Sequence, residues 1–197
     1  MSGSTIIAFL LLTVPAFITP GPNNLMLMAS GARFGVRRTL PHLLGIHIGF
    51  PLMLFVIGLG LGELFTLYPL VGIVLKYVSA LYFLWMAWHL LGLKIGEGEK
   101  VSRPMRFYEA MLFQWVNPKA WGIAISFVAA FIVPGEGRLL SLVLIALGCL
   151  VVGPFASVVW LVSGQQLHNL LRRTRTEKYL GVFMAILMLS AVVLFLI

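Results

Sequence analysis

The sequence predicts an all-α integral membrane protein with six transmembrane helices arranged as two inverted three-helix repeats. Two observations carry this prediction. First, 60% of the 197 residues are hydrophobic, only 10% are charged and the mean hydropathy is +1.03, which is more apolar surface than a soluble domain of this length buries. Second, six apolar stretches have roughly the 20 residues needed to cross a bilayer. They are 4–32, 39–61, 69–93, 107–133, 139–163 and 178–197.

The first stretch, 4–32, is interrupted by a cluster of helix-disrupting residues. Proline removes a backbone donor and clashes with the preceding turn, so nearby carbonyls and amides lose their helical partners. In hydrocarbon such groups are costly unless they face protein, water or a ligand. We therefore expect helix one to be broken, and we expect it to be a retained span because Met1 to Ser4 carry no basic residue typical of a cleaved signal peptide. The cluster reads Thr19, Pro20, Gly21, Pro22, Asn23 and Asn24.

The second and third stretches, 39–61 and 69–93, complete the first half of the chain. The hydrophilic segment that follows contains Gly96, Gly98 and Pro104 and is the one plausible linker. The sequence thus divides into a first three-helix repeat over 1–93, a cytoplasmic linker over 94–106 and a second three-helix repeat over 107–197.

The second half follows the pattern of the first. Its first apolar stretch, 107–133, is interrupted at Asn117, Pro118 and Lys119, so we expect helix four to be broken like helix one. Three spans per half give the two halves opposite orientations, and discontinuous helices in corresponding positions indicate a transport site near the bilayer midplane. The next stretches also correspond, with Gly45, Gly49 and Pro51 in one half and Gly148, Gly153 and Pro154 in the other.

The distribution of charge predicts the orientation in the membrane. The net charge of +8 is concentrated in alternate loops, which the positive-inside rule assigns to the cytoplasm, so both termini are expected to be periplasmic. Short cytoplasmic loops require such residues in any case, and we therefore expect no nucleic-acid partner. The basic residues are Arg33, Arg37 and Arg38 after helix one, Lys94, Lys100, Arg103 and Arg106 after helix three, and Arg172, Arg173, Arg175 and Lys178 after helix five.

Two motifs resemble the signatures of the LysE/RhtB family of bacterial amino-acid exporters. One is the Thr19 to Asn24 cluster, followed by Gly31 and a basic turn, and the other runs from Phe113 to Ala120 and reads FQWVNPKA. Length, hydropathy and motif order also agree, and within the family the chain is most similar to the branch exporting cysteine and O-acetylserine. The resemblance implies a secondary transporter in the bacterial inner membrane that exports an amino acid or a related metabolite from the cytoplasm.

A broken helix offers complements to both charged groups of an amino acid: free amides at a half-helix N-terminus and free carbonyls at the opposing end. Lys119 carries the strong positive charge near a break, so it is our candidate for the substrate carboxylate; its alternative roles are snorkelling to an interface or internal pairing. Asn23 and Asn24 have an alternative role as helix caps. The candidate substrate-binding residues are Pro20, Gly21, Pro22, Asn23, Asn24, Gln114, Asn117, Pro118 and Lys119.

The residues that the chain lacks narrow the chemistry. It has no aspartate, and its glutamates fall in loops or near helix ends, so we expect a neutral substrate such as cysteine, O-acetylserine, threonine or homoserine. His47 is the candidate for a proton relay, with packing as its alternative role. Cys149 is the one cysteine and no metal-ligand spacing occurs, so we expect no enzyme, no metal and no cofactor. A passive channel or an accessory membrane subunit is the alternative function, and the coupling ion and a homo-oligomeric state stay open.

Overall fold

The computed structural model describes residues 3–61, 67–91, 103–133, 135–174, 176 and 179–196. Every regular element in these ranges is helical, which confirms the all-α prediction for them. Most of the expected linker, residues 94–102, lies outside the described residues. The elements in chain order are α1 (Gly3–Ile18), α2 (Pro22–Val56), the π-helical turn η1 (Ile57–Leu61), α4 (Pro69–Leu91), α5 (Phe107–Phe113), the 3-10 turn η2 (Gln114–Val116), α6 (Pro118–Phe131), the 3-10 turn η3 (Gly135–Gly137), α7 (Arg138–Arg173) and α8 (Leu180–Leu196).

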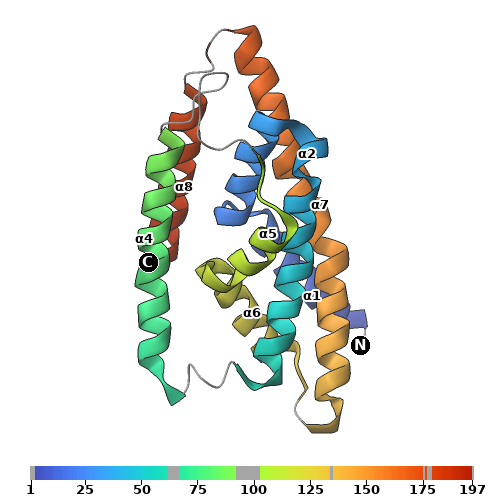
Figure 1. The fold of residues 1–197 in the computed structure, drawn as a ribbon. Helices are drawn as coiled ribbons and strands as arrows, with labels where there is room; N and C mark the ends of the chain where they lie inside the picture. The colour runs from blue at the N-terminus through green and yellow to red at the C-terminus, as the bar shows by residue number, and fades with distance from the viewer. Residues whose placement is uncertain are drawn as a thin grey trace.

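The segment α2 contains two helices that turn back on each other at Gly35. Its first part rises from Pro22 toward one end of the molecule and its second part returns (Figure 1). Gly35 has a φ of +78°, a left-handed conformation that glycine adopts without steric cost. The amide of Val36 donates to Oε1 of Gln165 in α7 at 3.0 Å, which fixes the turn. Helical residues therefore occupy most of 33–38, the segment that separates the stretches 4–32 and 39–61 predicted from hydropathy.

We call the end of the molecule reached by this turn the basic end. It carries Arg33, Arg37 and Arg38 around the turn, and α7 also runs toward it to end at Arg173 (Figure 1). The helix α7 continues well past the 139–163 stretch predicted from hydropathy, because a helix can extend beyond the apolar length that crosses a bilayer.

Glycines bring α2 and α7 into backbone contact. A Cβ atom at Gly31 would collide with the carbonyl of Leu161, and one at Gly164 would collide with the carbonyl of Met28. Only residues without a side chain permit helices to approach this closely. The first part of α2 is thus held against the longest helix of the described chain.

Glycines also seat α5 against the returning part of α2. A Cβ atom at Gly45 would collide with the carbonyl of Phe107, and one at Gly49 would lie 2.7 Å from the Cα atom of Met111. This packing places the end of α5 beside the start of α2, where the two interruptions of the chain meet.

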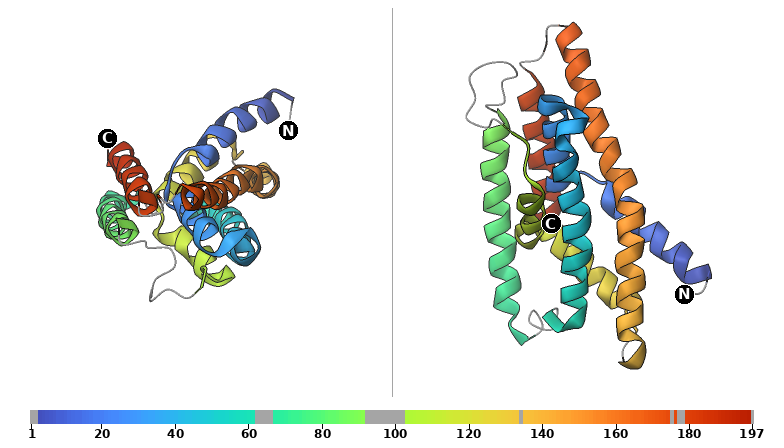
Figure 2. Two further views of the ribbon diagram at one scale, coloured as in Figure 1. Left: turned by 90° about the horizontal axis from the view of Figure 1, so that it is seen from above. Right: turned by 45° about the vertical axis from the view of Figure 1, so that its right-hand side comes forward.

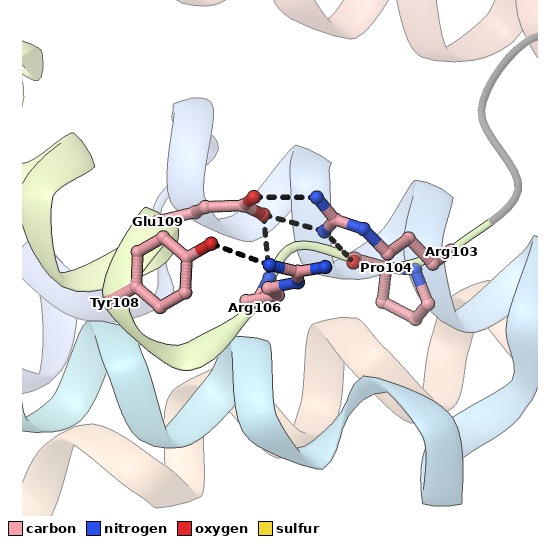
Figure 3. A network of polar contacts seen from close by, with 5 residues as sticks. All are labelled: Arg103, Pro104, Arg106, Tyr108 and Glu109. Atoms are coloured by element: carbon pink, nitrogen blue, oxygen red, sulfur yellow. Dashed lines mark hydrogen bonds and ion pairs between the residues drawn. The ribbon is translucent and has the colours of Figure 1, made fainter.

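The start of α5 is fixed by a polar network around Glu109 (Figure 3). The guanidinium of Arg103 donates to both carboxylate oxygens of Glu109, at 2.7 and 2.8 Å, and the amide of Arg106 donates to the same carboxylate at 2.8 Å. The hydrogen bond to Glu109 raises the pKa of the Arg103 guanidinium. The chain entering α5 from the basic end is thereby anchored to the first turn of the helix.

The remaining helices enclose this centre. Seen from above, α4 and α8 stand side by side at one edge, and α1 projects obliquely at another (Figure 2). Within the described residues, two helical segments are long and apolar enough to cross a membrane by length and composition, Pro22–Leu61 and Gly135–Arg173. Shorter apolar helices cover Gly3–Ile18, Pro118–Phe131 and Leu180–Ser190.

Candidate functional site

A cavity lies where the two interruptions meet. It holds about 530 Å³ of space free of atoms, with its open mouth included. Residues from α1, α2, α6 and α7 line it, so both halves of the chain contribute. The described lining residues are Ala16, Phe17, Gly21, Pro22, Asn23, Asn24, Ile46, His47, Phe50, Pro51, Asn117, Lys119, Ala120, Ile123, Cys149 and Ser157.

The first interruption, Thr19 to Gly21, separates α1 from α2. The helix α2 has proline at its first position, where the missing amide costs no helical hydrogen bond. No side chain caps the N-terminus of α2. Asn24 instead turns back, and its Nδ2 donates to the carbonyls of Phe17 at 2.7 Å and Thr19 at 2.9 Å. The positive end of the α2 dipole therefore lies at the cavity without a side-chain acceptor.

The second interruption, between α5 and α6, is tighter and caps itself. The chain passes from α5 through the 3-10 turn η2 to Asn117, which is extended with a φ of −93°. The side chain of Asn117 accepts from the amide of Lys119 at 3.1 Å, which is an N-cap, and Pro118 takes the first position of α6. Asn117 is 2% exposed, so this cap is part of the protein interior.

Lys119 reaches from the second interruption to the first. Its ammonium donates to the carbonyl of Thr19 at 2.8 Å, to the hydroxyl of Thr19 at 2.9 Å and to the carbonyl of Pro20 at 3.2 Å. Gly21 provides the room, since a Cβ atom there would lie 2.7 Å from Cδ of Lys119. An ammonium group has three donors, and these oxygens occupy all of them.

A second contact joins the interruptions through neutral amides. Nδ2 of Asn23 donates to Oε1 of Gln114 at 2.8 Å, and Nε2 of Gln114 donates to Oδ1 of Asn23 at 3.2 Å. Gln114 also donates to the carbonyl of Ala110 at 2.8 Å and is completely buried. The pair therefore links α2 to the end of α5.

His47 lines the cavity from the returning part of α2. Its side chain is 7% exposed, and Nε2 has no hydrogen-bond partner among the described residues. Gly153 of α7 leaves space for the ring, because a Cβ atom at Gly153 would lie 2.8 Å from Nδ1 of His47. A buried polar atom without a partner is costly, and a ligand group that forms a hydrogen bond with Nε2 would remove that cost.

Most of the residues selected from the sequence come together here. Gly21, Pro22, Asn23, Asn24, Asn117, Lys119 and His47 line the cavity. The other three candidates do not line the cavity. Pro20 and Gln114 take part in the contacts between the interruptions, and Pro118 begins α6.

Sequence reasoning missed Thr19, Cys149 and Ser157 as site residues. Thr19 belongs to the first motif, and its hydroxyl and carbonyl could have been considered as partners for a cation. Nothing in the sequence singled out Ser157, which is 5% exposed and lines the cavity from α7.

The charge of the cavity is positive. Lys119 is its one cationic side chain and no acidic side chain occurs among the described lining residues. The described part of the chain places Glu109 in the network at the start of α5 and Glu136 in η3, away from the lining. An uncompensated ammonium beside the positive end of a helix favours an anionic group.

Known efflux proteins are similar to this chain over most of its length. The cysteine/O-acetylserine efflux protein of Klebsiella pneumoniae is 28% identical over 170 residues, covering 86% of this chain and 87% of that protein. The protein of the same description from Escherichia coli K12 is 26% identical over 194 residues, 98% of each chain. No solved structure matches this chain significantly. The LysE type translocator family matches residues 14–197, and the chain is a member of that family.

Proposed function

We propose that this protein is a secondary transporter that exports a small neutral amino acid or amino-acid metabolite, of the cysteine or O-acetylserine type, from the cytoplasm across the bacterial inner membrane. Membership of the LysE type translocator family supports a transporter rather than an enzyme. The similarity to cysteine/O-acetylserine efflux proteins extends over nearly the whole chain, which supports this substrate class. The cavity at the two interruptions is the proposed binding site.

One observation carries the proposal: the ammonium of Lys119 lies beside Gly21, at the N-terminus of α2 that no side chain caps. Charge and helix dipole thus act on the same part of the cavity, and both favour the carboxylate of an amino acid. The substrate ammonium would face neutral acceptors, such as the side-chain oxygens of Asn23 and Ser157.

The absence of acidic groups from the described lining supports a neutral substrate side chain. A lysine or arginine substrate would bring a second cation to a cavity that already contains Lys119. In a low-dielectric environment that repulsion is costly without a carboxylate partner. The apolar lining by Phe17, Phe50 and Ile123 suits a small uncharged side chain.

The proposal includes a finer architecture. Six spans form two inverted three-helix repeats over 1–93 and 107–197, with the breaks of helices one and four at the site, a cytoplasmic linker over 94–106 and both termini in the periplasm. Two directions support it: α2 leaves its interruption toward the basic end, whereas α6 leaves its interruption toward the opposite end (Figure 1). The positive-inside rule assigns the basic end to the cytoplasm.

We also propose that protons drive export through His47. Its location in the lining and the unpartnered Nε2 atom support this role. His47→Gln should allow downhill efflux but abolish accumulation driven by a pH gradient in proteoliposomes. Accumulation at the wild-type level by His47→Gln would leave His47 as a packing residue and end its assignment as a relay.

The test of the function is export itself. Proteoliposomes containing the purified protein are loaded with radiolabelled O-acetylserine, cysteine or lysine, and the loss of label is followed with and without a pH gradient. We expect faster release of O-acetylserine or cysteine than of lysine, and uphill movement under a gradient. Release that never proceeds uphill under any ion gradient would favour a passive channel.

The role of Lys119 is tested with Lys119→Met, which keeps much of the stem and removes the charge. Loss of a charge-assisted hydrogen bond of roughly 1.5 to 3 kcal/mol predicts an apparent affinity about tenfold to hundredfold weaker. Ser126→Ala is the control, because its hydroxyl is exposed and donates only within α6, to Gly122. Normal export by Lys119→Met would exclude Lys119 as the carboxylate ligand.

A further inference from the structure

The two contacts between the interruptions occupy equivalent positions in the two halves. Asn23 directly follows Pro22, the first residue of α2, and Lys119 directly follows Pro118, the first residue of α6. Each reaches across to the segment preceding the other proline, Asn23 to Gln114 and Lys119 to Thr19. The same pattern of contact therefore occurs twice, once with neutral amides and once with a cation.

The two contacts join elements that lead to opposite ends of the molecule. Asn23 is the second residue of α2, whose first part rises to the basic end, and Gln114 directly follows α5, which the chain enters from that end (Figure 1). Lys119 is the second residue of α6, which runs to the opposite end, and Thr19 directly follows α1, whose N-terminus lies toward that end (Figure 2). One contact thus ties elements that lead to the basic end, and the other ties elements that lead to the opposite end.

The cationic contact is also the proposed carboxylate site. Thr19 and Pro20 occupy all three donors of the Lys119 ammonium. A substrate carboxylate can bind this ammonium only by replacing one or more of those oxygens. Binding of a carboxylate therefore weakens the contact between the end of α1 and the start of α6.

We propose that the two contacts are the two gates of the transport site: the Asn23–Gln114 pair toward the basic end, and the contact of Lys119 with Thr19 and Pro20 toward the opposite end, opened when a carboxylate takes the ammonium. The carboxylate step rests on the proposed function, whereas the positions of the gates rest on the contacts alone. Thr19 and Gln114 are positioning residues in this mechanism.

Cys149 provides a probe for the gates. It is the one cysteine of the sequence, it is 1% exposed, and it lines the cavity. Its rate of alkylation by a membrane-impermeant maleimide is measured from each side, in inside-out and right-side-out membrane vesicles. No substrate is required, so this measurement is independent of the exported compound.

Two variants open one gate each. Asn23→Ala removes the amide pair with Gln114, and Gly21→Ala introduces a Cβ atom 2.7 Å from Cδ of Lys119, which displaces that flexible side chain from Thr19. Loss of one such contact should raise alkylation about twofold to tenfold. The increase should appear from one side for Asn23→Ala and from the opposite side for Gly21→Ala, with Ser126→Ala unchanged.

The side from which Cys149 alkylation increases in each variant tests the two proposed gates. Increases from opposite sides support the gates, whichever end faces the cytoplasm. Increases from the same side, or no increase in either variant, would overturn the proposal. If a variant fails to fold, as judged by size-exclusion chromatography, Gln114→Met replaces Asn23→Ala and Thr19→Val replaces Gly21→Ala.

The carboxylate step has a separate readout. O-acetylserine should speed alkylation in the wild type from the same side as Gly21→Ala does, and O-acetylethanolamine, which lacks the carboxylate, should not. Equal effects of both compounds would show that the carboxylate does not open the gate, and the proposed positions of the two gates would not be affected. Failure to export both O-acetylserine and cysteine would instead contradict the proposed function.

Discussion

The two interruptions have similar residues but solve the same backbone problem in opposite ways. In the first, Asn24 acts as a donor and satisfies carbonyls at the end of α1, while the N-terminus of α2 has no side-chain cap. In the second, Asn117 acts as an acceptor and caps α6, the helix that it precedes. One interruption leaves helix amides without a side-chain acceptor and the other satisfies its own.

This difference indicates that the two interruptions have different roles at the site. The uncapped end of α2 lies beside Gly21 and the ammonium of Lys119, so the first interruption offers an anion its best position. The self-capped second interruption holds Lys119 in place and contributes its charge. Proline and asparagine thus indicate where a helix is interrupted. Whether the asparagine donates or accepts determines whether the N-terminus of the following helix is left open to a ligand.

The largest expected effect comes from making the same substitution at both interruptions. Asn24→Asp removes two donated hydrogen bonds and places a carboxylate against the carbonyls of Phe17 and Thr19, at a position that is 5% exposed. Leaving buried acceptors unsatisfied should cost about 2 to 4 kcal/mol of the free energy of unfolding. Asn117→Asp keeps the acceptor for the amide of Lys119 and places its charge at a helix N-terminus, so it should cost less than Asn24→Asp.

Both variants are compared with the wild type by thermal unfolding in detergent and by export. The Asn24→Asp protein should melt at a clearly lower temperature than the Asn117→Asp protein. Equal melting temperatures would show that the donor and acceptor roles assigned to the two asparagines are wrong.

Removal of the cap at the second interruption should have a smaller effect. Asn117→Ala loses the hydrogen bond to the amide of Lys119 and should lower the free energy of unfolding by about 1 kcal/mol. Asn117→Ser retains an acceptor of the right reach and should restore most of that loss. A serine variant as unstable as the alanine variant would mean that the Asn117 side chain contributes packing and no cap.

The positions of the interruptions could be predicted because their causes are local. Proline cannot continue a preceding helix, and Pro22 and Pro118, which lie in the two clusters where the sequence predicts interruptions, each begin a helix. The partners could not be predicted in the same way. Gln114 lies in a 3-10 turn and pairs with Asn23, from the other half of the chain.

The hydrogen-bond partners of Lys119 could not be predicted from the sequence either. Its charge near an interruption was evident from sequence, but its three acceptors, on Thr19 and Pro20, depend on how the two halves fold together. The capping role considered for Asn23 and Asn24 is realised by Asn117 instead. The length of α7 was underestimated for a different reason, because hydropathy reports the apolar part of a helix and not its polar continuation.

The smallest expected effect lies at the start of α5, which delivers the chain to the second interruption. Arg103 and Glu109 form a bidentate ion pair, with side chains 44% and 28% exposed. Exposed ion pairs contribute little to stability and are screened by salt, so Glu109→Gln should lower the melting temperature slightly, and the difference from the wild type should shrink as salt is added. Glutamine can still accept from the amide of Arg106, whereas Glu109→Ala cannot and should be less stable than Glu109→Gln at every salt concentration. Export per folded molecule should be unchanged in both. A folded Glu109→Gln protein without export would instead assign this carboxylate to transport, and the difference between the two interruptions would then extend to the segment that leads into α6.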